Sequence, residues 1–400
     1  MKIAIVVHGR FHAFDLARAL VARGHDVTLF TNYPAWAAER FGFPKERVRS
    51  FWSHGVLSRA NWWLHDKVRF PYFEAALHRM FGRWAAAELG RERWDVIHHW
   101  SGVAEEALCA DRRAGALHLL MRGSSHIRTQ RRLLEEEERR VGVSLDKPSP
   151  WMIAREEREY ALADYIVVLS TFAYESFVAQ GVPREKLRLL PLGANLEQFR
   201  PPPAVVEQRC RRIEAGEPLR VLYVGALSFQ KGFWDLVAMV RRLDGQAFRF
   251  RFVGPRTREV EDVVGELSRR VELLPKRPQG RLPEVYAGGD VFVFPTIQDG
   301  YAVVLAQAAA SALPILTTTN CSGPDLVREG ENGWVLPIRS AEAFVERLRW
   351  CDAHRRELAA MVRRIYQEFQ PRTWDEVAED FETICMNALR CGREGLSRGR

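Results

Sequence analysis

The feature that most constrains the fold of this chain is an alternation of strand-like and helix-like segments, which runs through the sequence twice. The chain opens with an apolar run at 2–7, a loop, an amphipathic stretch at 15–26 and a second apolar run at 27–31. Strands that alternate with helices favour a mostly parallel sheet wrapped on both faces. The sequence therefore predicts an α/β fold.

The alternation begins again after the proline-rich segment Phe199 to Pro203, which is typical of a connection between domains. A chain of 400 residues also exceeds what one hydrophobic core usually organises. We predict a first doubly wound unit at 1–200, a second at 201–372, a C-terminal helix at 373–391 that packs back toward the first unit, and a basic tail at 392–400. The strand candidates are 2–7, 27–31, 94–99, 116–121, 164–170 and 186–191, then 220–225, 248–254, 270–275, 290–295 and 313–318.

Composition excludes several classes of protein. Hydrophobic residues make up 47% of the chain and charged residues 28%, as in soluble globular proteins. No apolar run approaches the ~18 residues of a membrane span, and the N-terminus lacks a secretory pattern. The six cysteines form no C-x-x-C pair and no metal-ligand spacing. We expect a cytoplasmic protein without a bound metal.

Basic charge and tryptophan gather in the first hundred residues. This segment holds 15 Lys or Arg against 9 Asp or Glu, while the whole chain carries +8. It also holds seven of the twelve tryptophans. A basic, aromatic surface could meet an anionic membrane, a charged glycan or nucleic acid. Core tryptophans beside a solvated basic face would explain the same pattern, and the sequence leaves both interpretations open.

Two loops that follow strands of the second unit carry candidate chemistry, because ligands of open α/β sheets bind beyond the carboxyl ends of the strands. In the first loop, Gly225 turns the chain and Lys231 precedes a helix. Backbone N–H groups at a helix start, together with one lysine, suit a phosphate. This signal is weak alone, since glycine-rich turns are common.

The second loop follows Pro295 and ends in Asp299 and Gly300, before a helix predicted to begin near Tyr301. The first N–H groups of that helix, at 300–304, are expected to face the cleft and to suit an anion. Gln307 follows Asp299 by about two helical turns. The small residues Gly300 and Ala302 would allow a ligand to approach the backbone closely.

Together these loops resemble the nucleotide-sugar half of the family 4 retaining glycosyltransferases, which have the GT-B fold. The family pattern P-S-x-x-E-G-F-G stands here as P-T-I-Q-D-G-Y-A, and Gln307 replaces the second Glu of the E-x7-E spacing. Other landmarks of the family resemble the segments 181–201, 286–296 and 313–337. The resemblance covers essentially the whole chain and is silent about the acceptor.

The resemblance implies a function. A sugar would move from a nucleoside diphosphate sugar to an acceptor hydroxyl with its anomeric configuration retained, without a metal or other cofactor. The commonest setting is assembly of bacterial envelope or extracellular polysaccharide, with a glycan or lipid-linked acceptor. Related enzymes dock on membranes through basic, aromatic surfaces, so we expect peripheral contact of the predicted helical segment 58–89 with an anionic membrane.

The resemblance also assigns roles in the second unit. Lys231 corresponds to the lysine that contacts the diphosphate, whereas the partner arginine is replaced by Ala226. Arg256 is a candidate replacement for that arginine. Asp299 takes the place of the Glu that touches the donor sugar, and Gln307 that of the Glu that grips the ribose. The remaining donor-binding candidates are Gly225, Gly300, Tyr301, Ala302 and Val303.

In the first unit, His126 matches a family histidine that faces the donor sugar and is our second catalytic candidate beside Asp299. Gly9 and His12 occupy the place of the family's glycine-rich loop. Arg122 and Ser124 or Ser125 could position the acceptor or the diphosphate. The acidic and basic run at 135–140 is interpreted as a solvated helix face with i,i+4 pairs.

The main alternative is a degenerate homologue of the same fold that binds a nucleotide sugar or a partner without transfer. An epimerase-type protein would need further carboxylates in the cleft, and a nicotinamide dehydrogenase would need G-x-G-x-x-G after the first strand. Nucleic-acid binding is supported only by the basic charge, without a recognised module.

Overall fold

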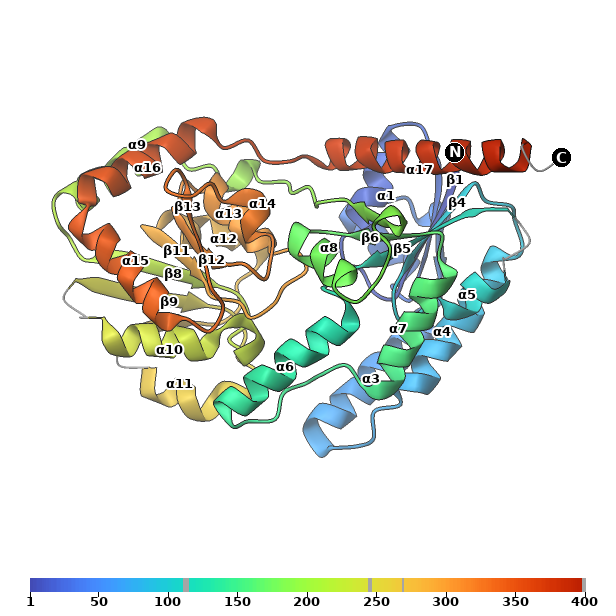
Figure 1. The fold of residues 1–400 in the computed structure, drawn as a ribbon, viewed down its shortest axis with the longest axis horizontal. Helices are drawn as coiled ribbons and strands as arrows, with labels where there is room; N and C mark the ends of the chain where they lie inside the picture. Colours follow the sequence, from blue (N-terminus) through green and yellow to red (C-terminus); the bar gives the residue numbers. More distant parts are fainter. Residues whose placement is uncertain (111–114, 244–246, 268–269, 398–400) are drawn as a thin grey trace.

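The structure, a computed structural model, describes residues 1–110, 115–243, 247–267 and 270–397. Two parallel sheets lie in separate halves of the molecule, each flanked by helices (Figure 1). In the described residues one sheet has seven strands and the other six. The predicted α/β fold with two doubly wound units is confirmed.

The inner strands of the first sheet are largely buried, because helices cover both of its faces. Residues 3–7, in the first strand of the chain, are fully buried. The edge strand β3 was not predicted, because only one of its three residues is apolar and no strand pattern stands out. In spatial order the strands are β3 (Val48–Ser50), β2 (Asp26–Thr31), β1 (Lys2–Val7), β4 (Val96–Trp100), β5 (Leu117–Arg122), β6 (Tyr165–Val168) and β7 (Leu187–Leu189).

The second sheet repeats this plan with one strand fewer. Its five predicted strands are confirmed, and the edge strand β13 was not among them. In spatial order the strands are β10 (Val271–Leu274), β9 (Phe248–Val253), β8 (Leu219–Val224), β11 (Val291–Phe294), β12 (Ile315–Thr318) and β13 (Gly333–Leu336).

Each sheet has a point where the strand order reverses. β1 lies between β2 and β4, and β8 lies between β9 and β11. At such a point the connections after the two neighbouring strands run to opposite sides of the sheet. This opens a crevice beyond the carboxyl ends of those strands. The loops after β8 and β11, which carry the candidate donor site, therefore lie at the crevice of the second sheet.

Helices cover both sheets. Those of the first half are α1 (Ala13–Ala22), α2 (Ala35–Ala38), α3 (Trp52–Val68), α4 (Glu74–Leu89), α5 (Glu105–Ala110), α6 (Ile127–Val141), α7 (Pro150–Leu162) and α8 (Thr171–Val178). Those of the second half are α9 (Pro203–Glu214), α10 (Phe233–Arg242), α11 (Glu261–Leu267), α12 (Leu282–Ala287), α13 (Val303–Ala310), α14 (Gly323–Leu326), α15 (Ala341–Ala353) and α16 (Arg355–Glu368).

The last helix, α17 (Trp374–Ser397), returns to the first half and lies along it (Figure 1). Its residues Val377, Phe381 and Cys385 belong to the same apolar cluster as the β1 side chains. Arg23, the residue directly after α1, pairs with Glu382 at 2.8 Å. The helix is longer than predicted and takes in most of the segment expected to be a tail, of which 398–400 lie outside the described residues.

Helix α6 crosses from the first half to the second. Leu134 and Leu145, on this helix and in the loop after it, are members of the apolar core of the second half. Arg140 donates two hydrogen bonds to the buried carboxylate of Asp235, at 2.6 and 2.9 Å. The prediction of a solvated face at 135–140 is therefore wrong in part, because Glu137 is fully buried and accepts from Arg339.

Across the part of the chain that the structure describes, no helix combines the length and apolar character needed to cross a membrane.

Candidate active site

The loops after β8 and β11 bring two predicted side chains together. Nζ of Lys231 lies 2.7 Å from Oδ2 of Asp299, and both side chains are about one-fifth exposed. The lysine ends a short 3₁₀ turn (Phe229–Lys231), in which Ser228 accepts a hydrogen bond from the backbone N–H of Lys231. The pair thus places one cation and one anion at the crevice of the second sheet.

The close approach of these two loops depends on Gly232. This residue adopts φ +79°, and a Cβ atom there would lie 1.9 Å from the carbonyl oxygen of Pro295. Only glycine avoids both the strained conformation and the clash. The contact holds the Lys231 loop against the loop of Asp299.

The loop after β9 joins the same edge of the sheet. Leu227 donates its N–H to the carbonyl of Pro255 and pairs with Arg256 as an isolated bridge. The Arg256 side chain is exposed. Its position beside the loop of Gly225 and Ala226 keeps Arg256 available as the replacement for the missing arginine, which stays a prediction.

The two halves of the molecule touch at the candidate site. A Cβ atom on Gly300 would lie 2.1 Å from the carbonyl oxygen of Gly123, in the loop after β5. Ser124 and Ser125 donate to the carboxamide oxygen of Gln298, at 2.8 and 3.3 Å. The loop after β5 is therefore pressed onto the loop that carries Asp299.

The start of α13 differs from the expectation. The helix begins at Val303, and most N–H groups before it already have acceptors inside the protein. Tyr301 donates to Oδ1 of Asp299 at 3.3 Å, Ala302 to the Ser322 hydroxyl at 3.2 Å, and Val303 to the carbonyl of Tyr301. The predicted anion site at 300–304 is thus largely satisfied by the chain itself, which leaves Lys231 as the stronger anion-binding group.

Gln307 is buried on α13, and its carboxamide oxygen accepts a hydrogen bond from the hydroxyl of Tyr286 at 2.9 Å. Burial raises the pKa of Tyr286 well above its usual value, so the hydroxyl stays protonated and able to donate. A neutral amide at this position avoids the desolvation cost that a carboxylate would carry. A neutral Gln fits this buried contact where the family pattern has Glu.

His126 stays a catalytic candidate by prediction, and the structure shows which groups its ring contacts. Its Nδ1 accepts the N–H of Arg128 and caps the start of α6. Its ring is buried against Tyr160 and Phe177, with centroids 5.1 and 4.9 Å away. Burial lowers the pKa of His126 to about 4. The histidine is therefore neutral at pH 7 and is engaged as a helix cap.

Arg122 makes its contacts inside the first half. It lies 3.0 Å from Glu156 and donates to Gln130 at 2.6 Å, and its side chain is largely buried. These contacts hold α6 and α7 against the end of β5. The contact of Arg122 with the acceptor or the diphosphate stays a prediction, and its charge is already compensated by Glu156 inside the first half.

The loop after β1 holds Gly9 and His12. Gly9 adopts φ +113° and accepts a hydrogen bond from Thr31 at 2.7 Å. Burial lowers the pKa of His12 to about 4, and its ring lies 5.1 Å from that of Trp100. Nε2 of His12 has no hydrogen-bond partner among the described residues.

Several contact residues of the site were not predicted. Gln298 bridges the two halves, and Tyr286 donates a hydrogen bond to Gln307. The hydroxyl of Ser322 accepts the N–H of Ala302. The backbone carbonyl of Asn320 accepts the N–H of Asp299. Nothing in the local sequence distinguishes them, since each acts through a segment remote in the chain. In the described residues no cluster of His, Cys, Asp and Glu could hold a metal ion.

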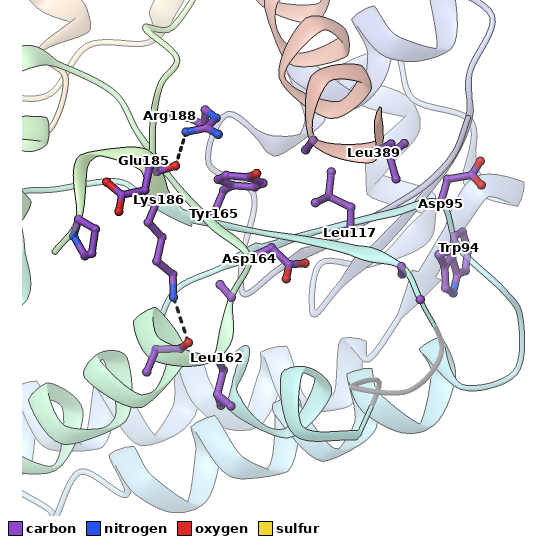
Figure 2. A pocket seen from close by; sticks show the side chains of 16 residues that line it. Trp94, Asp95, Leu117, Leu162, Asp164, Tyr165, Glu185, Lys186, Arg188 and Leu389 are labelled. Atoms are coloured by element: carbon purple, nitrogen blue, oxygen red, sulfur yellow. Dashed lines mark hydrogen bonds between the residues drawn. The ribbon is translucent and has the colours of Figure 1, made fainter. Parts of the chain in front are cut away.

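A separate cavity of about 1040 Å³ lies at the opposite edge of the first sheet (Figure 2). It is bordered by the amino ends of β5, β6 and β7 and by Leu389 of α17. Lys186 reaches a backbone carbonyl, that of Ala161, at 3.0 Å, and Arg188 stacks on Tyr165. Ligands of such sheets bind at the carboxyl ends, so this cavity does not belong to the candidate site.

Comparison with known proteins identifies the family. Residues 10–198 match the model of "Glycosyltransferase Family 4", and residues 218–352 match that of "Glycosyl transferases group 1". Together these matches take in most of both halves. The chain belongs to the family 4 glycosyltransferases and has their GT-B fold.

The chain is similar to relatives over about half its length. It is 27% identical over 203 residues to WcaL of Escherichia coli (strain K12), named as a colanic acid biosynthesis glycosyltransferase, with 48% of each chain covered. It is 25% identical over 199 residues to the amylovoran biosynthesis glycosyltransferase AmsK of Erwinia amylovora, with 47% of each covered. The chain thus covers about half the length of these relatives.

Among solved structures, Anabaena Alr3699/HepE in complex with UDP aligns over 100% of both chains with a TM-score of 0.62 and 15% identity. At 15% identity, this similarity shows that the two proteins share a fold and no more than that.

Proposed function

We propose that this protein is a glycosyltransferase that moves a sugar from a nucleoside diphosphate sugar to an acceptor hydroxyl, with retention and without a metal. The observation that carries the proposal is the Lys231–Asp299 pair at the crevice of the second sheet, pressed against the loop after β5. Such a crevice is where open α/β sheets bind their ligands. Anabaena HepE, a protein of the same fold, has been solved with UDP and with UDP-glucose.

In this mechanism Lys231 holds the diphosphate and offsets the charge that grows on it as the glycosidic bond breaks. A preorganised cation at the leaving group lowers the barrier without reorganisation during the reaction. Asp299, beside Lys231, accepts hydrogen bonds from hydroxyls of the donor sugar in this proposal. Gln307, fixed by Tyr286, offers its amide N–H groups to the ribose.

We place the reaction in polysaccharide biosynthesis, because the relatives WcaL and AmsK are named for colanic acid and amylovoran biosynthesis. The acceptor is then a glycan or a lipid-linked glycan. In this proposal α3 contacts an anionic membrane through a basic, aromatic surface. Its residues Trp62 and Trp63 are 59% and 55% exposed, and Lys67 is exposed on the same helix.

The first test is thermal unfolding of the purified protein with UDP, GDP, ADP and their sugar conjugates. A ligand that binds only the folded state raises the melting temperature, so we expect one nucleotide to do so and its sugar conjugate to do so further. Absence of any shift at millimolar ligand would overturn the proposal and favour a homologue that does not transfer sugar.

The proposed contact of α3 with a membrane is tested separately, by flotation of the protein with vesicles that contain anionic lipid. We expect co-migration at low salt that weakens at high salt, because exposed cations attract an anionic surface through a screened interaction. Replacement of Trp62 and Trp63 by Ala should reduce it. Failure of the wild-type protein to float at low salt would refute membrane contact.

A further inference from the structure

The strand β9 departs from the pattern of a buried parallel strand. It lies between β8 and β10, and an inner strand of a parallel sheet is ordinarily covered on both faces and apolar throughout. Its sequence instead alternates phenylalanine with arginine, as FRFRFV. The phenylalanines at 248, 250 and 252 are buried in the core of the second half, whereas Arg249 is exposed and Arg251 is partly exposed. In the part of the chain that the structure describes, one face of the second sheet is therefore open to solvent at β9.

A pocket of about 320 Å³ lies on this open face. Register places Arg220 of β8 beside Arg249. Leu222, two residues after Arg220, lies beside Arg251. Paired residues of neighbouring parallel strands project from the same face of the sheet, so the three guanidinium groups belong to one surface. The lining of the pocket includes these three arginines and Glu272 of β10, together with Gly288 and Gly289, which follow α12.

The lining of this pocket has more positive than negative charge. Nε of Arg251 donates to the carboxylate of Glu272 at 2.6 Å, so these two charges compensate each other. The side chains of Arg220 and Arg249 make no hydrogen bond and no ion pair with any residue that the structure describes. Arg220 is also half-buried, and a charged group withdrawn from water needs a partner of opposite charge. Two guanidinium groups in the pocket are thus available to an anion.

The pocket lies away from the candidate active site. Arg220 and Arg249 are the second residues of β8 and β9, and Gly289 lies before β11, so the pocket is at the amino ends of these strands. The crevice of the second sheet opens beyond the carboxyl end of β8, where Gly225 follows. Five residues of extended strand separate Arg220 from Gly225, which is about 16 Å. A small anion held by Arg220 is therefore not in contact with Lys231.

A phosphate group matches these two arginines in charge and in geometry. Each guanidinium presents parallel N–H donors that fit two phosphate oxygens, and it fixes the orientation of the phosphate in a way that an ammonium does not. Arg220 and Arg249 stand on adjacent strands, whose backbones are about 4.8 Å apart, so one phosphate can bind both. The volume of the pocket is near the lower end of the range of about 300–1,000 Å³ for sites of small molecules. The pocket therefore suits a small phosphate ester rather than a polymer.

We propose that this pocket binds a small, soluble phosphate ester, whose phosphate lies between the guanidinium groups of Arg220 and Arg249. Glu272, which keeps about half of its side chain exposed, then offers a carboxylate oxygen to a hydroxyl group of the same molecule. The site goes beyond the proposed function, because it lies outside the donor crevice and does not depend on sugar transfer. It stands even if Lys231 binds no nucleotide.

The probes are inorganic phosphate and glucose 6-phosphate, titrated calorimetrically into the full chain at low ionic strength. The Lys231→Ala variant is used beside the wild type, since it lacks the cation of the candidate donor site. We expect glucose 6-phosphate to bind Lys231→Ala saturably and more tightly than inorganic phosphate, whereas glucose does not bind. Absence of glucose 6-phosphate binding at millimolar concentration, or an affinity no greater than that of inorganic phosphate, would overturn the proposal.

Substitutions in the pocket locate the site. Arg220→Gln and Arg249→Gln, each combined with Lys231→Ala, should weaken glucose 6-phosphate binding about 10- to 100-fold, the range of a charge-assisted hydrogen bond. Arg249→Lys should weaken it less, because it keeps the charge without the guanidinium geometry. The matched control, Arg356→Gln, removes the same charge from an exposed arginine of α16 outside the pocket and should change nothing. Equal losses in Arg249→Gln and Arg356→Gln would refute the pocket as the site.

Membrane lipids are the other source of phosphate groups, and flotation with vesicles of phosphatidic acid separates the two sources. Arg249 is exposed, so Arg249→Gln should keep the melting temperature of the wild type. We expect this variant to float as the wild type does while its binding of glucose 6-phosphate is weakened. Loss of flotation in Arg249→Gln but not in Arg356→Gln would assign the pocket to a lipid headgroup and overturn the proposal of a soluble ester.

Discussion

Lys231 and Asp299 neutralise each other at the candidate site, and this pairing separates their expected roles. Their charged groups are 2.7 Å apart, and both remain partly open to solvent. A diphosphate bound by Lys231 has to share the ammonium group with the carboxylate. The lysine should therefore govern nucleotide affinity, and the aspartate should govern what happens to the sugar.

Substitution of the two residues tests this division. Lys231→Ala should weaken nucleotide binding about 10- to 100-fold, the range of a charge-assisted hydrogen bond. Asp299→Ala should leave nucleotide affinity unchanged or slightly tighter while transfer falls. Calorimetric titration of nucleotide with both variants provides the measurement. Equal loss of nucleotide affinity in both would show that the roles are not divided in this way.

His98 is a second residue whose environment has a measurable consequence. It lies fully buried in β4, and neither ring nitrogen has a hydrogen-bond partner among the described residues. Burial lowers its pKa to about 3, against about 6.5 in the unfolded chain. Between these values the unfolded state binds a proton that the folded state excludes, so stability is complete above pH 6.5 and is lost as the pH falls.

We expect His98→Phe to flatten this dependence. The wild-type free energy of unfolding should fall by up to about 1.4 kcal/mol per pH unit below pH 6.5 from this group alone. The variant should also be more stable at pH 7, because an unsatisfied buried polar group costs about 1–3 kcal/mol. Urea unfolding at pH 5 and pH 7 measures both effects, and identical slopes for the two proteins would rule out His98 as a source.

At the scale of elements, the contact between the loops after β5 and β11 depends on the absence of a side chain. A Cβ atom at Gly300 would lie 2.1 Å from the carbonyl oxygen of Gly123. The two loops come from different sheets, so they can approach this closely only where glycine leaves room. Gln298 then bonds to Ser124 and Ser125 across the same contact.

Gly300→Ala should separate these loops. We expect a loss of about 1–3 kcal/mol in the free energy of unfolding, as for other overpacked positions, and a reduced rate of transfer with nucleotide binding retained. Gly280→Ala is the matched control, because a Cβ there meets nothing within 4 Å. Chemical denaturation and transfer kinetics of both variants provide the comparison, and indistinguishable effects would show that the loop contact has no role.

At the scale of the whole molecule, α6 joins the two halves. His126 caps its start, next to the loop that touches Gly300, and Arg140 in its last turn binds the buried Asp235. Leu134 belongs to the apolar core of the second half. The helix therefore links the contact at the candidate site to the body of the second half.

Removal of one member of the Arg140–Asp235 pair leaves a charge without its partner. Arg140→Met should cost about 3–5 kcal/mol, because Asp235 would remain buried and uncompensated. The double variant Arg140→Met, Asp235→Leu should lose less than the sum of the single variants. Additive losses in a double-mutant cycle of urea unfolding would mean that the pair is not coupled.

The sequence by itself determined the α/β class, both sheets and the Lys231 and Asp299 loops, because strand and helix periodicity and glycine-marked turns are local properties of the chain. The edge strands β3 and β13 were not predicted, although strands of the same length elsewhere in the two sheets were. Only the tertiary structure showed the contacts of His126 and Arg122, the bridge that Gln298 makes between the halves, and the packing of α6 against the second half. Each depends on residues distant in sequence: burial against Tyr160 and Phe177 makes His126 a neutral helix cap, and the same loop in solvent would leave it free to titrate.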